Sequence, residues 1–123
     1  MAEPTQESRA ERGARGETLA LEFLITQGYR LVARNHRCAR GEIDIVAWDA
    51  DVLCFVEVRT RTPSRFGGPL ETIGHDKTRR IVRAARDFIQ GLPPPWPSMR
   101  FDAVGVELTE PPRFELVRGA FEA

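Results

Sequence analysis

The chain has 123 residues and a mass of 13.9 kDa, and its 18 acidic and 18 basic residues give a formal net charge of zero. This length, with 41% hydrophobic residues, is typical of one soluble globular domain, and the neutral balance argues against a simple polycation that coats nucleic acid. No apolar run approaches the roughly 20 residues of a membrane-spanning helix, and residues 1–16 lack the apolar core of a secretory signal. Two cysteines are too few for a disulfide framework, so we expect a cytoplasmic protein without a membrane partner.

Apolar residues recur at helical or strand spacing through most of the chain. Residues 1–12 lack this periodicity and are predicted to be a mobile tail, followed by a single domain over 13–123. The predicted elements, in chain order, are a helix over 16–27, a strand over 29–35, a hairpin of strands over 42–48 and 52–61, a loop over 62–74, a helix over 76–90, and strands over 99–108 and 114–117. This order predicts an α/β fold with a mixed sheet of about five strands and helices on its faces.

The predicted hairpin carries several charged residues. If 50–51 is a two-residue turn, the register places Asp44 opposite Glu57 and Glu42 opposite Arg59. Directly opposed side chains project to the same face of a sheet. The hairpin therefore brings two carboxylates and an arginine together on one face.

The surroundings of this charged face are apolar. Strand alternation puts Ile43 and Ile45 together on the opposite face, and Phe55 is an apolar neighbour of the acids. Two carboxylates in such a place repel each other, and a Mg²⁺ or Mn²⁺ ion would offset that cost and could activate water for phosphodiester hydrolysis. Glu17 lies on the inward side of the first helix and would be a third acid, while Arg59 could stabilise a phosphate. The alternative is an ordinary solvated face with a cross-strand salt bridge.

Several motifs together resemble the YraN family of small bacterial proteins. They are Gly16-Glu17, Gly28-Tyr29, Asn35, Gly41-Glu42-Ile43-Asp44, the run from Phe55 to Arg61, Lys77 with Ala85, and Arg100-Phe101-Asp102. The resemblance covers about 13–121. That family is similar to the restriction-endonuclease-like PD-(D/E)XK superfamily, especially archaeal Holliday-junction resolvases. The resemblance implies an αβββαβ core and metal-dependent endonuclease cleavage of DNA, and it supplies branched DNA as a substrate. Single-stranded DNA is the other expected substrate, and a homodimer is one expectation.

The resemblance also assigns roles to residues. It implies that Asp44 bridges the metal, that Glu57 is the second acid, that Val58 contributes its main-chain carbonyl, and that Glu17 is the acid carried by the helix. The superfamily's lysine falls at Arg59, which cannot act as a general base because arginine stays protonated in proteins. Two alternatives therefore stay open beside the nuclease: a weakened or inactive module that binds nucleic acid or a DNA-processing partner, and an interaction protein with no nucleic-acid role.

Basic residues cluster near and after the hairpin. Those predicted to contact nucleic-acid phosphates are Arg61, Arg65, Lys77, Arg79, Arg80 and Arg83. A solvated helix face is the alternative for the four in the second helix. Lys77 is the only lysine in the sequence.

Overall fold

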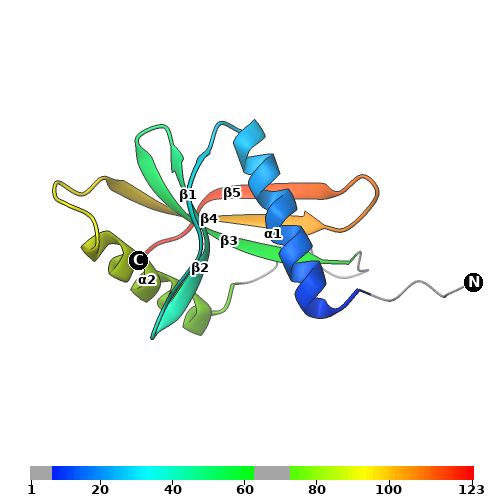
Figure 1. The fold of residues 1–123 in the computed structure, drawn as a ribbon, viewed down its shortest axis with the longest axis horizontal. Helices are drawn as coiled ribbons and strands as arrows, with labels where there is room; N and C mark the ends of the chain where they lie inside the picture. Colours follow the sequence, from blue (N-terminus) through cyan, green and yellow to red (C-terminus); the bar gives the residue numbers. More distant parts are fainter. Residues whose placement is uncertain (1–6, 63–72) are drawn as a thin grey trace, which may run out of the picture.

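The computed structural model describes residues 7–62 and 73–123. In these residues, two helices and a five-stranded sheet form the α/β fold that the sequence predicts. The elements in chain order (Figure 1) are α1 (Arg9–Thr26), β1 (Arg30–Cys38), β2 (Gly41–Asp49), β3 (Val52–Arg61), α2 (His75–Gln90), β4 (Ser98–Glu107) and β5 (Arg113–Phe121). No helix in the described ranges is long and apolar enough to cross a bilayer.

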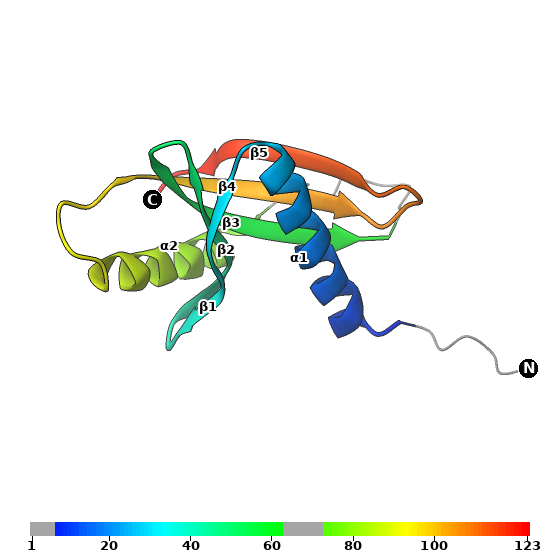
Figure 2. The ribbon, with the colours of Figure 1, turned by 45° about the horizontal axis from the view of Figure 1, so that its top comes forward.

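The strands lie in the sheet in chain order, from β1 at one edge to β5 at the other. Neighbouring strands are antiparallel except β3 and β4, which are parallel. A parallel pair requires a crossover connection, and the segment that contains α2 supplies it. α1 packs on one face, mainly against β3 and β4, and α2 packs on the other face, mainly against β2 (Figures 1 and 2).

The turn between β2 and β3 sets the register that the sequence predicts. Asp49 pairs with Val52, so the loop has two residues, and its first residue, Ala50, has a φ of 55°. Positive φ is what two-residue hairpin turns require. The predicted register is confirmed from this turn to the pairing of Ile45 with Val56.

Beyond these pairs, β2 leaves β3. The pairing of β2 with β3 ends at Ile45, whereas its pairing with β1 continues to Gly41, and Figure 2 shows this end of the β1–β2 ribbon projecting away from β3 beside α2. Ile43 packs in the apolar cluster under α2, while Ile45 packs in the cluster under α1. The expectation that both isoleucines share one face is therefore wrong, because a two-stranded ribbon twists strongly once it leaves the sheet.

The first helix begins at Arg9, earlier than predicted. Ser8 caps it, since its hydroxyl accepts a hydrogen bond from the Glu11 N–H at 3.1 Å. Residues 9–12, which the sequence assigns to the tail, are thus helical. Their turn is polar and largely exposed, so it carries no apolar periodicity that could reveal it. Two strands also run past their predicted ends, to Cys38 and Phe121.

Candidate functional site

The separation of β2 from β3 leaves a backbone group of β3 to be paired by a side chain. The Val58 N–H donates to Oδ2 of Asp44 at 2.8 Å. In a strand, the N–H and C=O of one residue point toward the same neighbour, so the Val58 carbonyl faces the same gap. The divergence of the strands therefore sets the Asp44 carboxylate beside the main chain of Val58.

Glu57 lies on the face of β3 that α2 covers, and it is only 3% exposed. In the first turn of α2, the Lys77 ammonium lies 2.6 Å from Oε1 of Glu57. The two groups form an ion pair, and besides this contact Oε1 has no hydrogen-bond partner within the described ranges. A buried acceptor of this kind is costly unless a cation faces it. Lys77 supplies this cation, so the site pairs a buried negative charge with a positive one.

Asp44 and Glu57 are neighbours, as the register implies. The pKa of Asp44 is raised to about 7. Burial is the largest cause and the negative charge of Glu57 is the next, whereas the hydrogen bond from the Val58 N–H opposes the rise. An aspartate in water has a pKa of about 3.9. Two carboxylates in this state favour sharing their site with a proton or with a cation.

Glu17 of α1 is the third acid that the sequence places here. Its Oε1 is buried and lacks a hydrogen-bond partner in the part of the chain that the structure describes. Burial first, and then the charge of Asp44, raises the pKa of Glu17. However, no three His, Cys, Asp or Glu side chains among the described residues form a group that could hold a metal ion by themselves. The structure joins Asp44 with Glu57 and leaves Glu17 as an electrostatic neighbour of the pair.

Two glycines allow the helices to approach the sheet at this site. A Cβ at Gly16 would lie 2.7 Å from the Thr60 Cβ, so α1 packs directly on the Thr60 side chain at the end of β3. A Cβ at Gly41 would lie 3.0 Å from the carbonyl carbon of Arg80, so β2 approaches the backbone of α2. The first contact brings α1 to the acid pair, and the second fixes the helix turn that follows Lys77.

Two clefts meet at Lys77. The first cleft, of about 360 Å³, contains the acid pair, and the second cleft, of about 400 Å³, lies between the start of α1 and the end of β3. Charged residues that line the first cleft are Arg37, Glu42, Asp44, Glu57, Lys77 and Arg80. Charged residues that line the second cleft are Arg9, Arg12, Glu17, Arg59, Arg61 and Lys77. The first cleft therefore combines three carboxylates with three cationic groups, and the second combines one carboxylate, that of Glu17, with five cationic groups.

The basic residues predicted to contact phosphates are divided between different surfaces. Lys77 and Arg80 line the first cleft and Arg61 the second. Arg79 and Arg83 line a separate hollow beside the carboxyl terminus. Arg65 lies outside the described residues. The predicted strip along the second helix is thus split between two of its flanks.

Glu42 forms its ion pair within the β1–β2 ribbon. Its Oε2 lies 3.2 Å from Nε of Arg37. The predicted position of Glu42 opposite Arg59 falls beyond the last paired residues of β2 and β3. Sequence reasoning could not foresee this, because the predicted register assumed that the two strands stay paired.

Sequence reasoning also missed three contributions to the site. Arg9 and Arg12 belong to the segment that the sequence predicts to be a tail, and for Lys77 the sequence predicts phosphate contacts rather than an ion pair with Glu57. The available signal was that Lys77 is the one lysine of an arginine-rich chain. Its partner is distant in sequence, and only the packing of α2 on the sheet reveals it.

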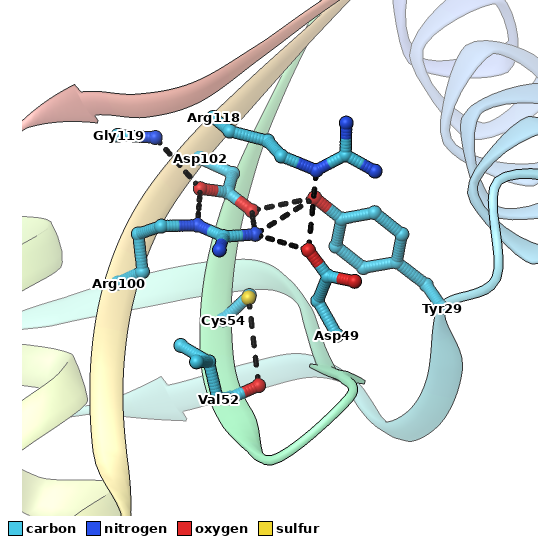
Figure 3. Close-up of polar contacts among 8 residues, drawn as sticks. All are labelled: Tyr29, Asp49, Val52, Cys54, Arg100, Asp102, Arg118 and Gly119. Atoms are coloured by element: carbon cyan, nitrogen blue, oxygen red, sulfur yellow. Dashed lines mark hydrogen bonds and ion pairs between the residues drawn. The ribbon is translucent and has the colours of Figure 1, made fainter.

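A second buried polar cluster lies near the turn between β2 and β3 (Figure 3). Asp102 is fully buried, and it accepts hydrogen bonds from the Tyr29 hydroxyl at 2.7 Å, from Nε of Arg100 at 2.8 Å and from the Gly119 N–H at 2.9 Å. Arg100 also donates to Asp49 at 2.6 Å. Every charge in this cluster has a partner, as expected for a polar network that stabilises the fold.

The structure thus defines a class: an α/β domain with a mixed five-stranded sheet, in which half-buried Asp44 and buried Glu57 lie together where two strands separate. The model of the Uncharacterised protein family UPF0102 matches residues 16–106, a range that contains the acid pair and Lys77. The chain belongs to the UPF0102 family, which agrees with the resemblance to YraN-like proteins.

Individual relatives align over most of their length. A UPF0102 protein of Chlorobaculum parvum is 49% identical over 94 residues, which cover 76% of this chain and 73% of the relative. A UPF0102 protein of Anaeromyxobacter sp. (strain Fw109-5) is 45% identical over 115 residues, or 93% of this chain and 86% of the relative. A UPF0102 protein of Mycolicibacterium vanbaalenii is 44% identical over 102 residues, or 83% and 84% of the two chains.

Proposed function

We propose that this protein is a Mg²⁺- or Mn²⁺-dependent endonuclease that hydrolyses phosphodiester bonds of DNA, with a fold of the PD-(D/E)XK type. The observation that carries the proposal is the pairing of half-buried Asp44 with buried Glu57 beside Val58, with the pKa of Asp44 raised to about 7. A carboxylate pair of this kind opposes folding unless a cation or proton relieves it. The order of helices and strands is consistent with the αβββαβ core that the resemblance implies.

The donor atoms at the pair fit a hard divalent cation. The carboxylates of Asp44 and Glu57 and the Val58 carbonyl are all oxygen donors, and the Lys77 ammonium, 2.6 Å from Oε1 of Glu57, would share that carboxylate with the ion. A bound Mg²⁺ or Mn²⁺ ion would polarise a phosphoryl oxygen and make water a better nucleophile. Glu17, whose pKa is raised by burial, is placed to hold or accept a proton at the edge of the site.

The positive charge at the acid pair comes from α2. Lys77 contacts Glu57, whereas Arg59 lines the second cleft with Glu17. A lysine facing a cleft can orient a phosphate or stabilise developing negative charge. We therefore assign that role to Lys77, and to Arg59 a contact with the DNA backbone.

The test is cleavage of supercoiled plasmid and of a labelled four-way junction, with Mn²⁺ and with EDTA. The purified protein should cut with Mn²⁺, and Asp44→Asn and Glu57→Gln should each abolish cutting. Asp51→Asn, which removes an exposed carboxylate at the hairpin turn, is the matched control and should cut like the unmodified protein. Cleavage that persists in both site variants would overturn the proposal.

A second candidate is a module that binds nucleic acid without hydrolysing it. The observation in its favour is the ion pair between Lys77 and Glu57, which partly neutralises the site without a metal. In that case Mn²⁺ should leave the DNA intact while DNA still binds at low salt. Isothermal titration with Mn²⁺ separates the candidates, because only the nuclease needs a metal site that disappears in Asp44→Asn.

The proposal includes a homodimer, which the resemblance to resolvases suggests. Light scattering of the purified protein measures its mass in solution. A dimer should have twice the chain mass of 13.9 kDa. A mass of one chain, with and without DNA, would remove this part of the proposal and leave the site unchanged.

A further inference from the structure

We infer that one DNA strand crosses the acid pair, with phosphates held on one side by Arg9 and Arg12 and on the other side by Arg37 and Arg80. The site would then act within a strand rather than at a strand end. The catalytic part of this inference rests on the proposed function, whereas the path of the strand is a statement about binding and can be tested without cleavage.

The first argument is the continuity of the two clefts. Lys77 lines both of them, and its ammonium marks the position of the acid pair through its contact with Glu57. Val58 lines the second cleft, while its N–H is bound by Asp44 of the first. The acid pair therefore lies in the first cleft next to its junction with the second, and the two clefts extend from this junction in two directions, as a strand that continues past the acids requires.

The second argument is the charge at the two outer ends. Arg9 and Arg12 come from the first turn of α1, and Nη1 of Arg12 donates to the Glu7 carbonyl at 2.9 Å, which holds this side chain in place. On the far side, Arg37 is exposed and pairs with exposed Glu42 at 3.2 Å. An exposed ion pair is worth little, so a phosphate can replace the carboxylate at small cost. Arginines are therefore available on both sides of the acids.

The third argument concerns what the clefts lack. Neither cleft has an aromatic side chain among its described lining residues. Proteins that bind single strands through their bases rely on aromatic stacking, whereas arginine contacts to phosphate carry no sequence information. The expected substrate is thus a strand recognised by its sugar–phosphate backbone, without preference for base sequence.

The experiment measures DNA binding by fluorescence anisotropy, in EDTA so that no metal-dependent cleavage occurs. The probes are labelled oligothymidylate in a linear form and in a covalently closed circular form. Arg9→Ala/Arg12→Ala and Arg37→Ala/Arg80→Ala should each weaken binding by about tenfold or more, and each should lower the slope of log affinity against log salt by about 1.4, since each lost phosphate contact removes about 0.7 for a single strand.

The matched control is Arg30→Ala/Arg86→Ala, which removes two positive charges outside both clefts and should leave affinity within about twofold. The circle should bind as tightly as the linear strand, because a strand that lies across the site needs no free end. A circle that binds about tenfold more weakly would overturn the inference. A loss of DNA affinity in the variant of only one of the two clefts would overturn it too. A loss in Arg79→Ala/Arg83→Ala that exceeds the loss in the cleft variants would overturn it as well, and would place the strand on the outer flank of α2.

This design separates the inference from the proposed function. If the cleft variants lose binding and Mn²⁺ never produces cleavage, the strand path stands and the nuclease fails. If Mn²⁺-dependent cleavage requires Asp44 but the cleft variants bind normally, the nuclease stands and the strand path fails. Thermal unfolding of each variant shows whether it is folded, and Arg→Gln versions replace any variant that is not.

Discussion

The ammonium of Lys77 lies 2.6 Å from Oε1 of Glu57, so the only lysine of the chain faces a glutamate that is 3% exposed. The lysine belongs to the crossover helix α2, and the glutamate belongs to β3, at the point where β2 departs. The charge at the acid pair therefore depends on how α2 packs on the sheet, and Gly41 sets that packing by its close approach to the backbone of Arg80.

The first prediction follows from this ion pair. Lys77→Met keeps the aliphatic chain but leaves the Glu57 carboxylate without its cation. Removing one partner of a buried pair costs about 3–5 kcal/mol, and because the Lys77 side chain is 51% exposed we expect a smaller loss, of about 1–2 kcal/mol in the free energy of unfolding at pH 8. Cleavage should fall by about 100-fold or more if Lys77 stabilises the developing charge. Denaturant unfolding and the plasmid assay measure the two effects.

Arg79→Met is the control for this change, since it removes a charge from the same helix outside both clefts. It should alter neither stability nor cleavage. If Lys77→Met cuts like the unmodified protein while Arg59→Ala does not, the role assigned to Lys77 belongs to Arg59.

The second prediction concerns Asp44, whose charge opposes folding. Its raised pKa means that the folded protein keeps a proton that the unfolded chain releases, so stability is lost as the pH rises from about 4 to about 7. Asp44→Asn retains an acceptor for the Val58 N–H and removes this loss. In EDTA at pH 8 we expect the variant to be more stable by about 2 kcal/mol, a gain that disappears below pH 4.

Mn²⁺ should reverse the order of stability. A cation that binds only the folded state raises the unfolding temperature of the unmodified protein and leaves Asp44→Asn unchanged. Differential scanning calorimetry with EDTA and with Mn²⁺ at two pH values gives all the comparisons. An Asp44→Asn variant that is less stable than the parent at pH 8 in EDTA would show that the carboxylate has no unfavourable charge to relieve.

Local patterns in the sequence were sufficient for the order of elements and for the hairpin register. The two-residue turn after Asp49 and strand alternation predicted the pairing as far as Ile45 with Val56, and this pairing is confirmed. The place where β2 leaves β3 was not predictable, because it results from the twist of the whole β1–β2 ribbon. That twist accounts for the error at Ile43.

The site was predictable only in part, for a similar reason. Asp44 and Glu57 belong to one hairpin and directly adjoin its last paired residues, so the predicted register indicates that they are neighbours. Lys77 and Arg9 reach the site through helix packing over long separations in sequence, and the α1 turn that carries Arg9 is polar and exposed. Secondary-structure propensity and hydrophobic periodicity do not reveal such contacts.

The third prediction tests the close approach of α1 to β3. Gly16→Ala forces its new methyl group against Thr60 and should destabilise the protein by about 2 kcal/mol. Thr60→Gly opens the space, so the double variant should recover about 1 kcal/mol relative to the sum of the single changes. Denaturant unfolding of the four proteins measures this coupling.

Gly13→Ala is the matched control, because it lies on the same helix with nothing within 4 Å of its added Cβ. It should stabilise the protein by about 0.5–1 kcal/mol through helix propensity. If Gly16→Ala behaves like Gly13→Ala, the contact with Thr60 does not fix α1.

The last prediction concerns the cluster around Asp102 (Figure 3). Burial alone would raise the pKa of Asp102, but hydrogen bonds from Arg100, the Gly119 N–H and the Tyr29 hydroxyl outweigh it and hold that pKa below its usual value. The sign is thus opposite to that at Asp44: the stability from Asp102 is present above a pH of about 4 and is lost as the pH falls through the folded-state pKa.

Tyr29→Phe should cost about 1–2 kcal/mol and Asp102→Asn about 3 kcal/mol at pH 7. The Asp102→Asn variant should also lose less of its free energy of unfolding than the parent as the pH falls. Mn²⁺ should stabilise this variant as much as it stabilises the parent. A variant that loses the Mn²⁺ effect would show that this cluster affects the geometry of the acid pair across the sheet, in addition to stabilising the fold.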